Sequence, residues 1–547
     1  TIGDLAEASA RIRDLADHAA ADEADLLVLP ELSILGYPPR DLLRRAEVVP
    51  ACEAAVERLA RDLPLPTLIG SPRRVEGGSR PIANAVALCR GGVVEAWHDK
   101  ILLPTYDVFD ESRWFEPGSS PLVFELETAS GPRRVGILIC EDLWRAEDAE
   151  AGRRYDLDPV GMLAEAGCDL VVSPSASPFV AGKATRHRTI LARVAKRLDA
   201  PVAMVNQTGG HDDLIFDGGS MIVRPDASVA GGLPRFEEGI AVFDPGDGRT
   251  VDVADHDENE ERFLALRRSI ADYCRRSGHP GAVLGLSGGI DSAVVVALAV
   301  AALGPDAVLG LLLPSRHSSE GSLIDARASP GALGLRAEEV PIEPLHAAFE
   351  TTLDPLLRLD GDGFGGLADE NVQARSRGVL LMAVSNARRR LLLSTSNKSE
   401  LAVGYSTLYG DMCGGLAPIG DLWKTEVFAL ARWMNEHHRR LGFPAPPVPT
   451  SSIEKPPSAE LRPDQRDDDS LPSYDVLDAY LRARVDEERG PEDIEREIGI
   501  DAGTGAHLER LLAISEFKRY QATIIPKLAP RTFGRGREMP VVARWRP

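Results

Sequence analysis

The sequence has few cysteines, no long apolar run and little positive charge. Its six cysteines are Cys52, Cys89, Cys140, Cys168, Cys274 and Cys413. None of them falls in a CxxC pair, so neither a structural zinc site nor a disulfide framework is expected. No stretch reaches the roughly 18 uninterrupted apolar residues of a membrane span, and no secretory signal opens the chain. These absences favour a protein of the reducing cytoplasm.

The balance of charge is strongly acidic, with a formal net charge of -22. Because the phosphates of nucleic acids and anionic lipids would be repelled, neither nucleic acid nor membrane is expected as a partner. A locally basic pocket for a phosphorylated metabolite remains compatible with this charge. The length of 547 residues, with 44% hydrophobic and 27% charged residues, is typical of a globular protein with two or more domains.

Residues 1–245 alternate short apolar runs with helix-period segments. Leu26–Leu29 and Val135–Ile139 are such runs, and Asp41–Asp62 and Thr185–Leu198 carry the helical pattern. This alternation predicts a layered α/β domain. Residues 246–261 are polar and acidic and form the expected linker.

Residues 262–547 form the second predicted domain. A helical segment at Arg262–Ser277 leads into the strand Ala282–Leu286, a glycine-rich turn, the helix Ala293–Ala302 and the strand Ala307–Leu313. This order predicts a parallel sheet with ligands at the carboxyl ends of its strands. The proline-rich, charged segment Pro446–Pro472 is expected to be a long loop.

The turn after the strand Ala282–Leu286 has the composition of a phosphate-binding loop. It reads Gly285, Leu286, Ser287, Gly288, Gly289, Ile290, Asp291 and Ser292. Adjacent glycines let backbone N–H groups approach phosphate oxygens, and the following helix supplies partial positive charge. No lysine follows the glycines, so it is not a Walker A loop. Taken alone, the segment is also compatible with a Gly-Gly turn that only joins a strand to a helix.

This loop resembles the pyrophosphate loop of ATP pyrophosphatases, which include the NAD⁺, GMP and asparagine synthetases. Further segments follow in the order found in NAD⁺ synthetases. They are ENVQAR at 370–375, STSNKSE at 394–400, KTEV at 424–427, KPPSAEL at 455–461 and EFKR at 516–519. Ser396 stands where the family has glycine. Together these segments favour the NAD⁺ synthetases.

The resemblance implies a Rossmann-like ATP pyrophosphatase fold and roles for particular residues. Thr395 and the loop Gly285–Ser292 would bind ATP. The deamido-NAD⁺ site would comprise Asn371, Glu400, Lys424 and Lys518. Asp291 and Glu400 would hold Mg²⁺, which prefers hard oxygen ligands. Lys398 and Lys455 would either add to a positive lining or be solvated surface residues.

The first domain carries a glutamate, a lysine and a cysteine, each next to an apolar strand. They are Glu31 in LPEL, Lys100 in KILLPTY and Cys140 in GILICEDLW. Singly, each is typical of ordinary structure: a buried thiol, a loop glutamate, a surface lysine. Together they resemble the catalytic triad of the nitrilase, or carbon–nitrogen hydrolase, family.

That resemblance implies an α/β/β/α sandwich and an amide-hydrolysing mechanism. Glu31 would accept the thiol proton, Cys140 would attack the glutamine amide, and Lys100 would stabilise the oxyanion. Tyr106, Ser177 and Lys183 would bind glutamine, and Glu111 would be a supporting carboxylate. The fold normally opens with a core strand, and the initial TIGDL resembles the loop after that strand. We therefore expect the strand to precede Thr1.

Both halves together resemble the glutamine-dependent NAD⁺ synthetase family, whose bacterial two-domain members are octamers. The resemblance implies a homo-oligomer and a protected ammonia channel between the two sites. One alternative is another glutamine amidotransferase, but GMP and asparagine synthetases use a Cys–His–Glu glutaminase or an N-terminal cysteine. The other is a binding or regulatory protein, which would be expected to lack a triad or loop residue. None is missing here.

Overall fold

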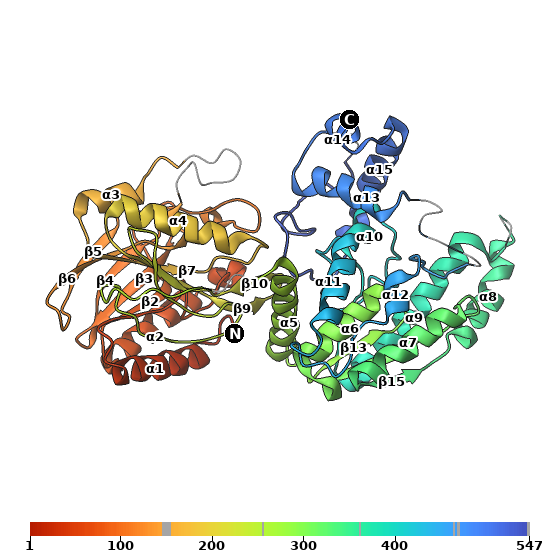
Figure 1. Ribbon diagram of the computed structural model, residues 1–547, viewed down its shortest axis with the longest axis horizontal. Coiled ribbons are helices and arrows are strands. Elements are labelled where there is room, and N and C mark those ends of the chain that lie inside the picture. The colour runs from red at the N-terminus through yellow and green to blue at the C-terminus, as the bar shows by residue number, and fades with distance from the viewer. Residues whose placement is uncertain are drawn as a thin grey trace. The chain divides into compact units, whose positions relative to one another are not determined.

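The computed structural model describes residues 1–144, 155–253, 256–359, 361, 363–462, 465, 467 and 471–543. The chain forms two compact units. The first comprises Thr1–His211 and Ile215–His256, and the second Asp212–Leu214 and Asp257–Pro547. The chain leaves the first unit at His256, inside the segment predicted as a linker. Figure 1 shows both units, and each is described separately below.

Two stacked sheets form the centre of the first unit. The sheet of order β1-β2-β3-β4 contains β1 (Leu27–Val28), β2 (Thr67–Arg74), β3 (Ile82–Arg90) and β4 (Val93–Asp99). The sheet of order β12-β11-β8-β7-β6-β5 contains β5 (Leu122–Leu126), β6 (Arg133–Ile137), β7 (Leu170–Ser175), β8 (Val202–Asn206), β11 (Met221–Val223) and β12 (Val229–Gly232). β9 (Thr208–His211) pairs with β10 (Leu214–Asp217).

Helices cover the outer face of each sheet. In Figure 1, α1 (Leu5–Ala21) and α2 (Val48–Asp62) lie on one side of the strands, and α3 (Pro159–Ala166) and α4 (Lys183–Leu198) lie on the other. Between the sheets, Val86 and Leu88 pack in one core cluster with Val135 and Ile137. A strand covered on both faces can be apolar along most of its length, as β3 is. The predicted α/β/β/α sandwich is thus confirmed.

The second unit contains a four-stranded parallel sheet of order β15-β14-β13-β16. Its strands are β13 (Ala282–Gly285), β14 (Val308–Leu312), β15 (Arg336–Glu339) and β16 (Leu391–Leu392). The chain adds β14 and β15 on one side of β13 and later places β16 on the other side. The strand order therefore reverses between β13 and β16, and in open α/β sheets ligands bind at such a switch point.

Two helices flank the phosphate loop in sequence. α5 (Glu258–Arg276) is capped by Asp257, whose side chain accepts hydrogen bonds from the N–H groups of Asn259 and Glu260. The predicted start at Arg262 is four residues late, because Asp257 caps an acidic first turn that suits a helix N-terminus. After its first turn, which contains Asp291 and Ser292, α6 (Ile290–Leu303) is apolar on all sides, and its middle is accordingly buried.

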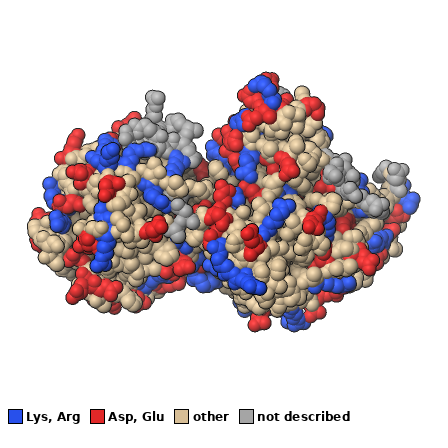
Figure 2. All heavy atoms as spheres, viewed as in Figure 1, with Lys and Arg blue, Asp and Glu red and all other residues tan. Residues whose placement is uncertain are grey.

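The remaining helices surround the sheet and build a C-terminal helical part. They are α7 (Glu320–Leu333), α8 (Glu343–Leu357), α9 (Gly366–Arg388), α10 (Lys398–Val403), α11 (Lys424–Glu436), α12 (Thr450–Glu454), α13 (Tyr474–Leu481), α14 (Pro491–Ile498), α15 (Ala502–Ile514) and α16 (Glu516–Arg519). The helix α12 interrupts the predicted loop Pro446–Pro472. No helix among the described residues has the length and apolar character needed to cross a membrane. On the face seen in Figure 2, acidic and basic side chains are interspersed over both units.

Candidate active sites

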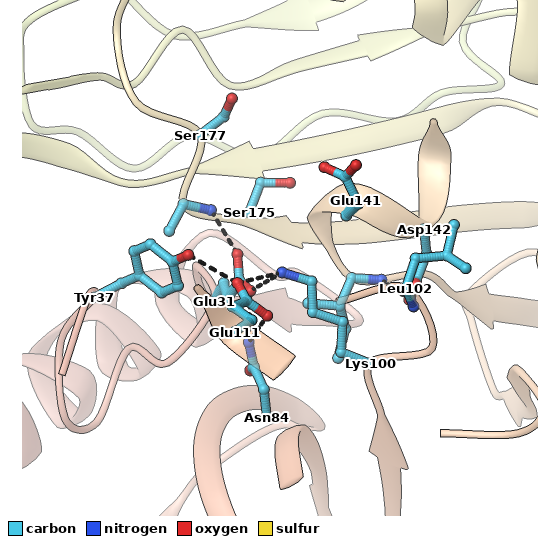
Figure 3. A network of polar contacts seen from close by, with 12 residues as sticks. Glu31, Tyr37, Asn84, Lys100, Leu102, Glu111, Glu141, Asp142, Ser175 and Ser177 are labelled. Atoms are coloured by element: carbon cyan, nitrogen blue, oxygen red, sulfur yellow. Dashed lines mark hydrogen bonds and ion pairs between the residues drawn. The ribbon is translucent and has the colours of Figure 1, made fainter. Parts of the chain in front are cut away.

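Three strand ends of the first unit bring the predicted triad together. Glu31 follows β1, Lys100 follows β4 and Cys140 lies just after β6, and all three side chains are buried. Lys100 Nζ donates to Glu31 Oε1 at 2.7 Å and to Glu111 Oε1 at 2.7 Å. In Figure 3 the amine of Lys100 points toward these two carboxylates. Glu111, the predicted supporting carboxylate, is thus a direct partner of the lysine.

Neutral donors hold the two carboxylates in place. Asn84 Nδ2 donates to Glu31 Oε1 at 2.7 Å, and the N–H of Ala176 donates to Glu31 Oε2 at 3.0 Å. The hydroxyl of Tyr37 donates to Glu111 Oε1 at 2.7 Å. Buried carboxylates need such donors, because an unpaired buried charge is costly. Burial raises the pKa of Glu111 to about 7, with the charge of Glu31 adding to the effect and Lys100 opposing it.

Cys140 has the geometry of a nucleophile held on a strained turn. It begins a short 3₁₀ helix (Cys140–Leu143) and has φ of +47°, which is uncommon for a residue with a side chain. Burial raises the pKa of its thiol well above the ordinary value, and the charge of Glu31 adds to this while Lys100 opposes it. The thiol is therefore protonated in this site, and an attack needs a base to remove the proton as the bond forms.

A buried aspartate ties the lysine segment to the cysteine segment. Asp142 Oδ1 accepts hydrogen bonds from the N–H groups of Ile101 at 3.1 Å and Leu102 at 2.7 Å. Its Oδ2 accepts from the N–H of Ile139 at 2.9 Å. Because these residues adjoin Lys100 and Cys140, the carboxylate of Asp142 fixes the spacing of two triad members.

A pocket opens beside the sulfur of Cys140. It is lined by Cys140, Leu143, Trp144, Ser175, Ser177, His187, Ile190, Leu191 and Met204. Ser177, predicted to bind glutamine, lies in it and shares a 3.2 Å hydrogen bond with His187 Nε2. Lys183 is the first residue of α4, and its side chain lies outside the described part of the chain.

The residue after the cysteine is a carboxylate held by tyrosines. Tyr106, also predicted to bind glutamine, donates to Glu141 Oε2 at 2.9 Å, and Tyr155 donates to Glu141 Oε1 at 2.6 Å. Ser175 and Ser177 line the pocket beside Cys140, and Figure 3 labels them together with Glu141. The neighbourhood of Cys140 therefore contains a carboxylate together with hydroxyl groups, which suits a polar, charged substrate.

In the second unit, the phosphate loop joins β13 to α6 at the switch point. Its serines brace it internally: the N–H of Gly289 donates to Ser287 Oγ at 3.1 Å, and Ser292 Oγ donates to the carbonyl of Gly289 at 3.0 Å. Gly288 has φ of +80°, and a Cβ there would lie 2.1 Å from the carbonyl oxygen of Ser322. Only glycine fits this position without displacing α7.

Two carboxylates meet beside this loop. Lys424 Nζ lies 2.5 Å from Asp291 Oδ2 and 3.2 Å from Glu400 Oε1. Burial raises the pKa of Glu400 to about 8, with Asp291, Asp467 and Asp411 adding to the effect and Lys424 opposing it. Burial alone would lower the pKa of Lys424, but Asp291 and Glu400 raise it, so the lysine is protonated.

The predicted metal pair fits a hard divalent cation. Since one nitrogen atom contacts both carboxylates, Asp291 and Glu400 can present oxygens to one cation, and the surrounding carboxylates favour positive charge. Mg²⁺ is typically held by one or two carboxylates together with substrate phosphates. The described residues contain no group of three or more histidine, cysteine, aspartate or glutamate side chains suited to a metal ion.

The other predicted ligands lie on three different segments of the second unit. Thr395 lies in the loop between β16 and α10. Asn371 lies on α9, where its Oδ1 accepts from the hydroxyl of Thr407 at 2.9 Å. Lys518 Nζ donates to the carbonyls of Gly404 and Ser406 at 2.7 and 2.6 Å, and burial lowers its pKa.

Two lysines considered for a positive lining have other surroundings. Lys398 is fully buried and pairs with Asp421 and Asp486 at 2.9 and 2.8 Å, so it is neither a lining residue nor solvated. Lys455 is partly exposed and pairs with Asp325 at 3.0 Å. The aspartates that bury Lys398 come from distant segments, and no local pattern could have indicated them.

Comparison with known proteins follows the same division of the chain. The carbon–nitrogen hydrolase family matches residues 1–245, and the NAD synthase family matches residues 263–522. Glutamine-dependent NAD(+) synthetases from Synechocystis sp. and Xanthomonas campestris are each 42% identical to this chain. The alignments cover 100% and 96% of this chain and 98% and 92% of those proteins.

The chain belongs to the glutamine-dependent NAD(+) synthetase family.

A solved member of this family has the same fold. The glutamine-dependent NAD⁺ synthetase from Acinetobacter baumannii, determined in complex with ADP, is 35% identical. It superimposes with a TM-score of 0.76, over 100% of this chain and 97% of that one. The family membership explains why one chain carries both a nitrilase-type unit and an ATP pyrophosphatase-type unit.

Several residues that hold the sites in place were not singled out from the sequence. They are Tyr37, Asn84, Asp142 and Asn397, whose hydrogen bonds reach Glu111, Glu31, the backbone next to Lys100 and Cys140, and Asp291, respectively. Asp142 lies in GILICEDLW and Asn397 in STSNKSE, so these motifs could have indicated both residues from the sequence. Tyr37 and Asn84 bond to carboxylates that are far from them in the sequence, so only the folded structure reveals these contacts.

Proposed function

We propose that the chain amidates deamido-NAD⁺ to NAD⁺ with ammonia that it releases from L-glutamine, converting ATP to AMP and pyrophosphate. The observation that carries this proposal is the pairing of two sites in one chain. The first unit groups Cys140, Glu31 and Lys100, and the second places a glycine-rich phosphate loop at the switch point of a parallel sheet. Neither site alone would specify a glutamine-dependent ligase.

In the first unit, the buried Glu31 removes the proton of Cys140 as the sulfur attacks the side-chain amide of glutamine. The raised pKa of the thiol makes this assistance necessary. The ammonium of Lys100 stabilises the oxyanion of the tetrahedral intermediate. Glu31 then gives its proton to the nitrogen as the C–N bond breaks. Ammonia departs, and the glutamyl group stays on Cys140 as a thioester. Glu31 next accepts a proton from water as its oxygen attacks the thioester. The C–S bond breaks, glutamate is released, and Glu31 returns the proton to the sulfur of Cys140.

Binding of glutamine in this site needs partners for its α-amino and α-carboxylate groups. We assign Tyr106, Ser177 and Lys183 to substrate binding, as the family resemblance implies. Tyr106 and Ser177 flank the region of Cys140, as their contacts with Glu141 and His187 require. The carboxylate of Glu141 has the charge that a substrate ammonium would need.

In the second unit, the nicotinate carboxylate must be activated before an amine can replace its oxygen. Its oxygen attacks the α-phosphorus of ATP, pyrophosphate leaves, and an acyl-adenylate forms. Backbone N–H groups of the loop and the N-terminus of α6 would bind the phosphates. Ammonia then attacks the acyl carbon and displaces AMP. We assign Thr395 to ATP, and Asn371, Glu400, Lys424 and Lys518 to deamido-NAD⁺.

We assign Asp291 and Glu400 to Mg²⁺, which when bound would neutralise charge on the ATP phosphates. The support is that both residues offer carboxylate oxygens and that these oxygens lie close to one shared atom, Lys424 Nζ. Lys424 lies between the same carboxylates and adds a second positive charge beside the phosphate loop. The charges of Asp291 and Glu400 outweigh the effect of burial and keep this lysine protonated.

Two further proposals concern the assembly and its surroundings. By family resemblance we propose a homo-oligomer, an octamer as in bacterial two-domain members. We also propose that the enzyme works in the reducing cytoplasm, which is supported by its six free cysteines. Sedimentation of the purified chain tests the first, and fractionation of cells tests the second.

The decisive experiment supplies the purified chain with deamido-NAD⁺, ATP and Mg²⁺, plus either glutamine or ammonium, and measures NAD⁺ and AMP. NAD⁺ should form from both nitrogen sources in the unmutated chain. Cys140→Ala should abolish the use of glutamine and spare ammonium, because it removes only the nucleophile. Cys168→Ala, which removes a half-buried thiol of the same unit, is the matched control and should retain both activities. If the unmutated chain forms NAD⁺ with neither glutamine nor ammonium, the proposal is refuted.

A further inference from the structure

Asn397 lies at the point where the chain turns from β16 into α10. Its side chain is completely buried, although asparagine is usually exposed. The side-chain oxygen accepts a hydrogen bond from the N–H of Glu400 at 3.0 Å, and the carboxylate of Glu400 returns toward the N–H of Asn397. This arrangement is a capping box, which satisfies the free N–H groups of a helix start.

The amide nitrogen of the same side chain has a second partner on a different element. Asn397 Nδ2 donates to Asp291 Oδ1 at 3.0 Å, and Asp291 stands in the first turn of α6. One short side chain thus reaches the carboxylate of Asp291 with its donor and the backbone of Glu400 with its acceptor. It spans the gap between the phosphate loop after β13 and the segment after β16.

Lys424 contacts the carboxylates of both Asp291 and Glu400. Its Nζ contacts Asp291 Oδ2 and Glu400 Oε1, so each oxygen of Asp291 has a different donor. A lysine has a long, flexible side chain, whereas an asparagine side chain has only two rotatable bonds. The rigid link between the two carboxylate-bearing segments is therefore Asn397.

We propose that Asn397 is a positioning residue: it orients the carboxylate of Asp291 relative to Glu400, so that both present oxygens to the same cation. The inference rests on the proposed function, which assigns that cation to the ATP-using reaction. Helix capping by itself does not account for the contact. A cap needs only an acceptor, which serine or aspartate supplies equally well. Asparagine is the capping residue that also carries two N–H donors.

The test distinguishes the capping hydrogen bond of Asn397 from its hydrogen bond to Asp291. Asn397→Ser keeps a hydroxyl acceptor for the N–H of Glu400 but is too short to reach Asp291. Mn²⁺, which electron paramagnetic resonance detects directly, replaces Mg²⁺ and is titrated into the full chain with ATP and without deamido-NAD⁺. Because no turnover occurs, binding is measured apart from activity. We expect Mn²⁺ to bind about 10- to 100-fold more weakly to Asn397→Ser, as when other supporting partners of metal ligands are removed.

A matched control is Asp501→Ala. Asp501 caps α15 by accepting from the N–H of Thr504 at 3.0 Å, and it is an exposed residue of the same unit. Its loss should leave Mn²⁺ binding unchanged. In steady-state assays with ammonium, Asn397→Ser should raise the Mg²⁺ concentration for half-maximal rate more than it lowers the rate at saturating Mg²⁺. The KM for glutamine in the first unit should not change.

Equal Mn²⁺ affinity in Asn397→Ser and the unmutated chain, with both melting cooperatively, would overturn the inference. Should Asn397→Ser fail to melt cooperatively, Asn397→Thr supplies a second cap of the same reach, and its Mn²⁺ affinity decides the matter in the same way. The proposed function fails independently: an unmutated chain that binds Mn²⁺ and ATP but forms no NAD⁺ contradicts that function. The binding comparison would still decide the role of Asn397.

Discussion

The ammonium of Lys100 lies 2.7 Å from the carboxylate of Glu111, and both side chains are buried. Only ten residues separate them in the chain, on the segment that runs from β4 into a short 3₁₀ helix. Because Glu31 approaches the same ammonium, Lys100 lies between two carboxylates. One of them can then exchange protons with Cys140 and substrate while the other keeps the lysine charged and in position.

Replacing Glu111 with glutamine should reduce glutamine-dependent NAD⁺ formation and leave ammonium-dependent formation unchanged. Glutamine preserves the size and an acceptor for Tyr37, but it removes the charge that holds Lys100. A displacement of about 1 Å in a catalytic group can lower a rate by about 100-fold, and we expect a loss of this order in kcat for glutamine. Glu125→Gln, on an exposed face of β5, is the control. An unchanged rate of glutamine-dependent NAD⁺ formation in Glu111→Gln would contradict the supporting role of Glu111.

Replacing Gly288 with alanine should abolish NAD⁺ formation from both nitrogen sources while glutamate release continues. The new Cβ would lie 2.1 Å from the carbonyl oxygen of Ser322, so the loop or α7 must move. Gly304→Ala provides a matched control, because Gly304 has φ of +81° but no atom within 4 Å of its Cβ position. It carries the backbone strain without the collision. If both variants lose synthesis equally, strain alone would explain the effect.

Replacing Lys398 with methionine should strongly destabilise the second unit. Burial lowers the pKa of this lysine, but Asp421 and Asp486 outweigh burial and raise it. Removing it leaves two buried carboxylates unpaired, which costs about 3–5 kcal/mol of unfolding free energy. Arg336→Met breaks an exposed pair with Glu338, and such pairs contribute about 0–1 kcal/mol. Urea unfolding followed by circular dichroism measures both, and equal midpoints would contradict the expected difference.

His98 should make the first unit sensitive to acid. Burial lowers its pKa from 6.5 to about 4, so the folded state holds the ring neutral. Below pH 6.5 the unfolded chain binds a proton that the folded chain does not. Stability therefore falls as the pH drops from 6.5 toward 4, by about 1.4 kcal/mol for each pH unit.

His98→Gln cannot take up this proton and should lose less stability over the same pH range. The exposed His18 on α1 is the control site, and His18→Gln should follow the unmutated chain. Urea midpoints recorded between about pH 7 and pH 5 compare the three proteins. Parallel curves for His98→Gln and the unmutated chain would show that another group governs the acid sensitivity.

Much of the fold was predictable because its signals are local. The apolar run at 282–286, the glycine pair and the following apolar segment determine a strand, a loop and a buried helix without reference to distant residues. The start of α5 was less predictable, since Asp257 acts as a cap only once the backbone has turned. The alternation in residues 1–245 indicated layers, but it could not sort the strands β1 to β12 into separate sheets, because strand pairing joins residues far apart.

The sequence by itself determined the candidates for the chemistry: which residues can be proposed as nucleophile, base, oxyanion donor and phosphate-binding loop. These depend on side-chain type and motif, and they persist whatever surrounds them. The tertiary structure decided which groups work together. It buried Lys398 among aspartates, placed Glu111 against Lys100, and linked Asp291 to Glu400 through Asn397. Lys100 and Glu111 are 11 positions apart in the chain, and Asn397 and Asp291 are 106 apart. The energies of such contacts depend on burial, which no local pattern records.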